Sequence, residues 1–196
     1  MLASRGLPPV AFDEARRMIG NGARAMLQAG LAAAGTPPDR LVLDRLFADF
    51  LRHYAAHIAD TSRPFPGAIA ALDRFAGAGW GLAICTNKLE ALSRQLLRSL
   101  DLESRFAMIA GQDTFGVRKP DPRHLTETVR KAGGRTDSAV MVGDSDIDVR
   151  AARNAGVPVV AVAFGYSPVP VAELGADRVI GHFDELFAAA SALRSP

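Results

Sequence analysis

The sequence is poor in cysteine and aromatic residues and contains no long apolar run. One cysteine in 196 residues cannot form an internal disulfide, which fits a reducing cytoplasm. No stretch reaches the roughly 18 apolar residues that predict a membrane span. The N-terminal residues also lack the apolar core of a signal peptide. We therefore expect a cytoplasmic protein with no membrane partner.

An excess of charge of one sign is also missing. Lysine and arginine total 23 against 21 acidic residues, and a net charge of +2 does not predict a nucleic-acid partner. Lysine itself is scarce, because the basic residues are arginines apart from Lys88, Lys119 and Lys131. What is present is an ordinary globular composition, 48% hydrophobic and 22% charged. The length suits one large domain, or one domain with a smaller insert.

The pattern of apolar residues changes near residues 64–67. Residues 1–62 carry apolar positions at helical spacing only, which predicts a small all-helical domain. Over residues 63–196, short apolar runs alternate with helix-like segments, which predicts an α/β domain whose parallel sheet has helices on both faces. The predicted strands cover 81–85, 106–110, 139–142, 157–163 and 178–180, and the predicted helices of this part cover 68–76, 89–100, 122–132, 147–155 and 183–193.

Polar residues gather at the ends of the predicted strands. Thr86 and Asn87 follow the strand 81–85, Asp144 follows the strand 139–142, and Lys119 lies in the loop before a helix. Because the carboxyl ends of parallel strands meet at one edge, we expect these side chains to converge. A hydroxyl, a lysine and carboxylates suit a phosphate ester held by Mg²⁺. Each alone is also typical of a helix cap or turn, so it is their order and spacing that favour a phosphate site.

These segments resemble a known family. In chain order they are Thr86-Asn87, Arg118-Lys119-Pro120-Asp121-Pro122 and Gly143-Asp144-Ser145-x-x-Asp148. They resemble motifs two, three and four of the haloacid dehalogenase-like hydrolases. The resemblance implies a Rossmann-like α/β core over 63–196 and a small helical cap domain over 1–62. Within the predicted cap, residues 17–23 resemble the substrate-facing segment of phosphoglycolate phosphatases.

The resemblance also implies roles for single residues. Thr86 and Asn87 would bind the phosphoryl oxygens, and Lys119 would pair with the phosphoryl group and a nucleophilic carboxylate. Asp144 would ligate Mg²⁺, and Asp148 would orient the metal site or the lysine. The implied activity is hydrolysis of a small phosphorylated metabolite, with 2-phosphoglycolate favoured, through a phosphoaspartate intermediate.

The predicted cap supplies further candidate residues. The resemblance implies that Gly20, Asn21 and Gly22 close over the substrate. Charge alone makes Arg17 and Arg24 candidates for contacting a substrate carboxylate. The oligomeric state is open, a homodimer being one option.

The first motif of the family, an Asp-x-Asp that carries the nucleophile and the acid/base, is missing before the predicted cap. The only Asp-x-Asp stretch is Asp144-Ser145-Asp146 with its continuation to Asp148, which follows Thr86 and Lys119 and fits motif four. We therefore expect the first core strand to be missing too, which would leave its neighbours with unpaired edges. We expect the chain to be a fragment, from a misassigned start or a truncation. The alternative is a degenerate noncatalytic homologue that binds phosphate or acts as an interaction protein.

Other patterns favour structural interpretations. Residues 20–25 match a dinucleotide fingerprint, but no strand is predicted before them. Cys85 on a predicted buried strand is expected to be core filler. His53 and His57 have metal-ligand spacing without a third ligand, which indicates a solvated helix face. A receiver-like signalling module is disfavoured because Asp144 follows the threonine and lysine instead of preceding them.

Overall fold

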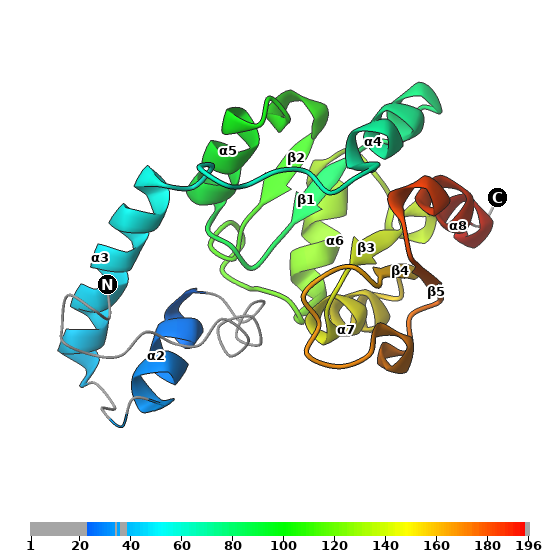
Figure 1. Cartoon of the computed structure of the whole chain (residues 1–196). Helices are drawn as coiled ribbons and strands as arrows, with labels where there is room; N and C mark the ends of the chain where they lie inside the picture. Colours follow the sequence, from blue (N-terminus) through cyan, green and yellow to red (C-terminus); the bar gives the residue numbers. More distant parts are fainter. Residues whose placement is uncertain (1–22, 34, 36–38, 195–196) are drawn as a thin grey trace.

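The structure is a computed structural model, and it describes residues 23–33, 35 and 39–194. A pair of helices comes first and is followed by alternating strands and helices (Figure 1). This is the α/β class predicted from the sequence. Within the described residues, no helix is both long and apolar enough to cross a membrane.

The helix pair consists of α2 (Ala23–Ala33) and α3 (Arg40–Ala56). Leucines at helical spacing on both helices form a separate small core of Leu27, Leu31, Leu43 and Leu46. Asp39 caps α3, since its carboxylate accepts a hydrogen bond from the Val42 N–H at 2.8 Å.

The remaining elements follow the predicted order, with ends shifted by a few residues. The helices are α4 (Ala68–Gly77), α5 (Glu90–Ser99), α6 (Pro122–Lys131), α7 (Asp146–Ala155) and α8 (Leu186–Leu193). The strands are β1 (Ala83–Cys85), β2 (Met108–Ala110), β3 (Met141–Gly143), β4 (Val159–Val162) and β5 (Arg178–Ile180). Short 3-10 turns cover Glu103–Arg105, Thr136–Ser138, Val171–Leu174 and Phe183–Glu185.

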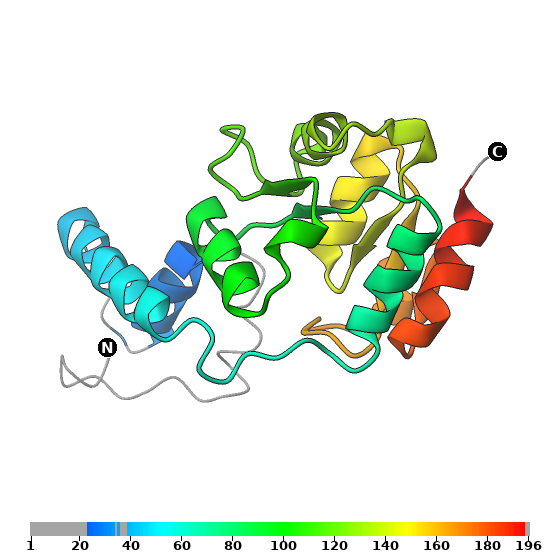
Figure 2. The ribbon, with the colours of Figure 1, turned by 90° about the horizontal axis from the view of Figure 1, so that it is seen from above.

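Helices cover both faces of the strands, as the apolar runs predict. The fully buried strand β4 shows this best, because its side chains alternate between two cores. Val160 packs with Phe75 of α4 and Leu186 of α8. Val159 packs with Leu125 of α6 on the opposite face, where α7 also lies. The pairing of α4 with α8 is visible from above (Figure 2).

The strands form two parallel sheets rather than one. β1 pairs with β2, and β3, β4 and β5 form the second sheet in that order. Between β1 and β3 lies a cavity of about 700 Å³, which we call the inter-sheet cavity. It is lined by both strands and by apolar residues of α4, α6 and α8. Within the described part of the chain, the edges of β1 and β3 that face the cavity are unpaired.

Candidate functional site

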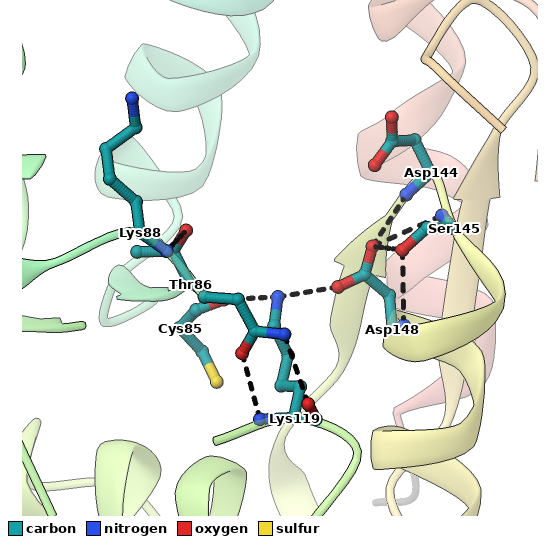
Figure 3. Close-up of polar contacts among 8 residues, drawn as sticks. Cys85, Thr86, Lys88, Lys119, Asp144, Ser145 and Asp148 are labelled. Atoms are coloured by element: carbon teal, nitrogen blue, oxygen red, sulfur yellow. Dashed lines mark hydrogen bonds and ion pairs between the residues drawn. The ribbon is translucent and has the colours of Figure 1, made fainter. Parts of the chain in front are cut away.

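Five of the residues predicted from the sequence meet at the carboxyl ends of β1 and β3 (Figure 3). They are Thr86, Lys119, Asp144 and Asp148, which the figure labels, and Asn87, which hydrogen-bonds to the Lys119 backbone. Thr86 directly follows β1, and its N–H extends the ladder by donating to the Ala110 carbonyl at 3.0 Å. Asp144 directly follows β3. The strand ends therefore bring together side chains that lie far apart in the sequence.

Lys119 is the centre of this cluster. Its ammonium donates to the Cys85 carbonyl and to Asp148 Oδ1, each at 2.6 Å. Both side chains of the ion pair are largely buried, with exposed fractions of 10% and 8%. Removing one partner of such a pair leaves a buried charge uncompensated, which costs about 3–5 kcal/mol. The pair therefore holds the lysine at the end of β1.

Asn87 fixes the loop that carries the lysine. Its amide nitrogen donates to the Lys119 carbonyl at 3.1 Å, and its amide oxygen accepts from the Lys119 N–H at 3.0 Å. The peptide bond between Lys119 and Pro120 is cis. Asn87 is buried, and the structure gives its side chain a positioning function. Its predicted contact with phosphoryl oxygens stays a prediction.

Asp148 is held in the first turn of α7 by its own helix cap. Ser145 is the N-cap residue, and Asp148 Oδ2 accepts from the Ser145 hydroxyl at 2.7 Å and from the Asp144 N–H at 3.1 Å. Burial raises the pKa of Asp148, but the Lys119 ammonium and these hydrogen bonds outweigh burial, and the net pKa lies below its usual value. Both carboxylate oxygens are engaged, so Asp148 orients Lys119 as an ionised group.

Asp144 has a more open arrangement. Its Oδ2 accepts from the Tyr166 N–H at 2.7 Å, in the loop after β4. Its Oδ1 has no hydrogen-bond partner among the residues that the structure describes. In Figure 3 the Asp144 carboxylate extends away from the pair of Lys119 and Asp148. Asp144 is therefore the carboxylate of the cluster that can bind an added cation.

Other predicted residues are not part of this cluster. Arg24 is ion-paired with Asp44 across the helix pair, and its guanidinium lies 5.6 Å from the centre of the Phe47 ring. Arg17, Gly20, Asn21 and Gly22 lie outside the described residues. Their predicted contacts with substrate stay predictions.

The sequence interpretation missed two residues near the cluster. Lys88 follows Thr86 and Asn87 directly, and its ammonium contacts the Tyr54 hydroxyl on α3. The scarcity of lysine was a signal that could have singled it out. His124 in α6 is fully buried, and neither ring nitrogen has a partner among the described residues. Burial, and then the nearby Lys119 charge, lower the pKa of His124 below its usual value.

Of the residues set aside in the sequence, His53 and His57 keep their structural interpretation, whereas Cys85 differs from the expectation because its strand β1 is only partly buried. Cys85 is half-buried and lines the inter-sheet cavity. Burial raises the pKa of its thiol and so disfavours the thiolate. His53 and His57 are exposed on α3, where His57 Nδ1 lies 2.7 Å from Asp60 Oδ2. Within the described residues, no group of three or more metal-ligating side chains forms.

Comparisons with known proteins identify the family of the chain. The profile of the haloacid dehalogenase-like hydrolases matches residues 1–162. A phosphoglycolate phosphatase of Mesorhizobium japonicum is 53% identical over 178 residues, covering 90% of this chain and 78% of that protein. A phosphoglycolate phosphatase of Agrobacterium fabrum is 45% identical over 185 residues, covering 94% of this chain and 79% of that protein.

Solved structures have the same fold. A predicted phosphoglycolate phosphatase from Haemophilus somnus superposes with a TM-score of 0.88 at 24% identity, covering 96% of this chain and 86% of that one. CbbY from Rhodobacter sphaeroides, in complex with phosphate, has a TM-score of 0.78 at 24% identity and covers 94% of this chain and 84% of that one. The chain belongs to the haloacid dehalogenase-like hydrolase family, and within it to the phosphoric monoester hydrolases.

Proposed function

We propose that this chain carries most of the active site of a Mg²⁺-dependent phosphatase of small phosphorylated metabolites, with 2-phosphoglycolate favoured. The observation that carries this proposal is the meeting of Thr86, Lys119 and Asp144 at the carboxyl ends of β1 and β3. A hydroxyl and a fixed ammonium suit an anionic phosphoryl group better than a neutral ligand, and the open carboxylate suits a cation that accompanies the phosphoryl group. The identity of the relatives named above supports the substrate.

Each residue has a distinct part in this reaction. The Thr86 hydroxyl donates to a phosphoryl oxygen. Lys119 neutralises the charge that develops on the phosphoryl group in the transition state. Asp148 keeps the lysine in place through their 2.6 Å contact, and Asn87 holds its backbone. Because these donors are already fixed before substrate binds, little reorganisation is needed during the reaction.

In this proposal the nucleophile is an aspartate on a further strand, one that would pair with β1 and β3 inside the inter-sheet cavity. The cavity separates two parallel strands, β1 and β3, whose facing edges have no partner among the described residues. A strand placed there would end beside Thr86 and Lys119. Its first aspartate would attack phosphorus and form a phosphoaspartate, and its second would protonate the leaving oxygen and then activate water.

Asp144 fits the metal that this chemistry uses. Mg²⁺ takes oxygen ligands and is commonly bound by one or two carboxylates, with substrate phosphate and water filling the other positions. The open Oδ1 of Asp144 offers one such ligand, whereas both oxygens of Asp148 already accept hydrogen bonds. When bound, the metal would neutralise phosphoryl charge.

The organisation of the protein is part of the proposal. We assign residues 1–62 to a helical cap domain and residues 63–196 to the α/β core. The substrate contacts expected of Gly20, Asn21 and Gly22, which lie outside the described residues, belong to the same proposal. The single cysteine is compatible with a cytoplasmic enzyme. We expect no nucleic-acid partner, and a homodimer is the assembly to test first.

One observation favours a second function, a noncatalytic phosphate-binding protein. The carboxylate that touches Lys119 is Asp148, and both of its oxygens are occupied by hydrogen bonds. Among the described residues, this leaves Lys119 without a free aspartate that could act as nucleophile. Such a protein would bind phosphate without hydrolysing its esters.

An extended protein separates the two functions. A strand ending in Asp-x-Asp is added at the N-terminus, and phosphate release from 2-phosphoglycolate is measured with Mg²⁺. The matched control carries Asn-x-Asp and lacks only the nucleophile. We expect turnover with the first protein and none with the control. Equal phosphate release by both proteins, or a folded Asp-x-Asp protein without turnover, would contradict the proposal.

A further inference from the structure

Lys88 lies beside the proposed phosphoryl site but has no part in the mechanism above. Its N–H donates to the Thr86 hydroxyl oxygen at 3.1 Å, which ties the two residues together. Its side chain extends away from the pair of Lys119 and Asp148, toward the same side as Asp144 (Figure 3). Lys88 therefore places a positive charge at the edge of the site.

The backbone of Lys88 is held on both sides, and its side chain is the part that can move. Its carbonyl accepts from the Gln112 N–H at 3.0 Å. Gly111 makes this close approach feasible, since a Cβ there would lie 2.7 Å from the Lys88 carbonyl oxygen and 2.2 Å from the Glu90 nitrogen. The ammonium is thus carried on a flexible stem from a fixed point.

The partner of the Lys88 ammonium is neutral. It contacts the Tyr54 hydroxyl of α3 and lies 4.4 Å from the centre of the Tyr54 ring. Within the described part of the chain, no carboxylate lies within ion-pairing distance of Lys88, whereas Lys119 is paired with Asp148. Hydrogen bonds between two charged groups are stronger than those to a neutral hydroxyl. An anion entering the site would therefore displace Tyr54 as the partner of Lys88.

We infer that Lys88 binds a second anionic group of the substrate, a carboxylate, and so selects short phosphorylated carboxylic acids over neutral phosphomonoesters. This rests on the proposed phosphatase function. The selected substrate is short because the Lys88 N–H lies 3.1 Å from the Thr86 hydroxyl oxygen, so that only the length of one lysine side chain separates the ammonium from the phosphoryl site. A single ammonium matches one carboxylate, and it lacks the fork of donors with which arginine binds a second phosphate. Arg24, the earlier candidate, is already paired with Asp44.

Binding to the chain of 196 residues tests this selection. Calorimetric titrations with Mg²⁺ compare 2-phosphoglycolate with ethyl phosphate, an ester that lacks the carboxylate. We expect the wild-type protein to bind 2-phosphoglycolate at least tenfold more tightly. Lys88→Met should remove most of that preference while weakening ethyl phosphate far less. Lys131→Met, a lysine at the end of α6, should leave the preference intact.

Tyr54→Phe gives an independent check, because it removes the hydroxyl that holds Lys88 but keeps the ring. It should increase the preference for 2-phosphoglycolate, because the ammonium no longer leaves a hydroxyl partner when the carboxylate binds, whereas a purely structural contact between α3 and Lys88 predicts no change in selectivity for either variant. An unchanged preference in Lys88→Met would overturn the inference and leave the proposed function standing. Failure of the wild-type protein to bind either ester would contradict the proposed function, and the inference with it.

Discussion

At the scale of single residues, the site depends on close contacts that leave no spare room. Gly143 shows this, because a Cβ added there would lie 2.4 Å from the Cβ and 2.5 Å from the Cγ of Asp148. Asp148 cannot move away without leaving Lys119. Position 143 therefore requires glycine, because the Asp148 side chain occupies the space that a Cβ would need.

Gly143→Ala should consequently destabilise the protein. Overpacking of this kind costs about 1–3 kcal/mol in the free energy of unfolding. Urea denaturation followed by circular dichroism measures it. Gly77→Ala is the matched control, since a Cβ there meets nothing within 4 Å. Equal stability of the two variants would show that Asp148 has more freedom than the structure gives it.

His124 predicts a pH dependence of stability. Its folded pKa is lowered by burial and then by the Lys119 charge, while its unfolded pKa is the ordinary value near 6.5. The unfolded chain therefore binds the proton more readily, and stability should be complete above about pH 6.5 and fall as the pH drops below it. His124→Leu should flatten this pH dependence, which is measured by denaturation curves taken at a series of pH values at and below about 6.5. His53→Leu, on the exposed face of α3, controls for loss of a histidine, and an equal flattening there would contradict the prediction.

At the scale of elements, the start of α7 links helix stability to the site. Ser145 caps the helix, and its hydroxyl also donates to Asp148. The cap of α3, Asp39, is exposed and bonds only the Val42 N–H among the described residues. The Ser145 cap therefore supports both α7 and the Asp148 carboxylate, whereas the Asp39 side chain, within the part of the chain that the structure describes, supports only the start of α3.

Ser145→Ala should cost more stability than Asp39→Ala. Loss of a cap alone costs about 0.5–2 kcal/mol, and Ser145→Ala also removes a donor from a buried carboxylate. Chemical denaturation of both variants measures the difference. A larger loss in Asp39→Ala would mean that Asp148 does not depend on Ser145.

The elements were predictable from the sequence because their patterns are local. Helical spacing and short apolar runs predicted the strands and α-helices that the structure has after residue 66, although not the short 3-10 turns, and the convergence of Thr86, Lys119 and Asp144 followed from parallel strands. Contacts between distant segments have no local pattern. The engagement of Asn87 with the Lys119 backbone and the contact of Lys88 with Tyr54 depend on how loops and helices pack, and so the sequence did not show them.

At the scale of the whole molecule, the inter-sheet cavity is the feature that sets the chain apart from a closed sheet. The only tryptophan and the only cysteine of the sequence, Trp80 and Cys85, both line it. The reactivity of Cys85 and the fluorescence of Trp80 therefore show, without an added label, whether the inter-sheet cavity is filled.

An added strand should therefore protect both residues. In the protein extended by a strand ending in Asp-x-Asp, Cys85 should react at least tenfold more slowly with a neutral thiol reagent, and Trp80 fluorescence should shift to shorter wavelength. An extension with proline in the middle of the strand is the control, because proline cannot donate to a central ladder. Unchanged Cys85 reactivity in a folded extended protein would place the strand elsewhere.

The central claim is that Lys119 acts on the phosphoryl group, and turnover of 2-phosphoglycolate by the extended protein tests it. Lys119→Met should lower the rate about a hundredfold or more, as expected for loss of a fixed charge at the reacting group. Lys131→Met should stay within about twofold. Because Lys119→Met leaves Asp148 unpaired, the double variant Lys119→Met with Asp148→Asn is measured too, and it should be equally inactive. A loss of only about tenfold in folded protein would contradict the account.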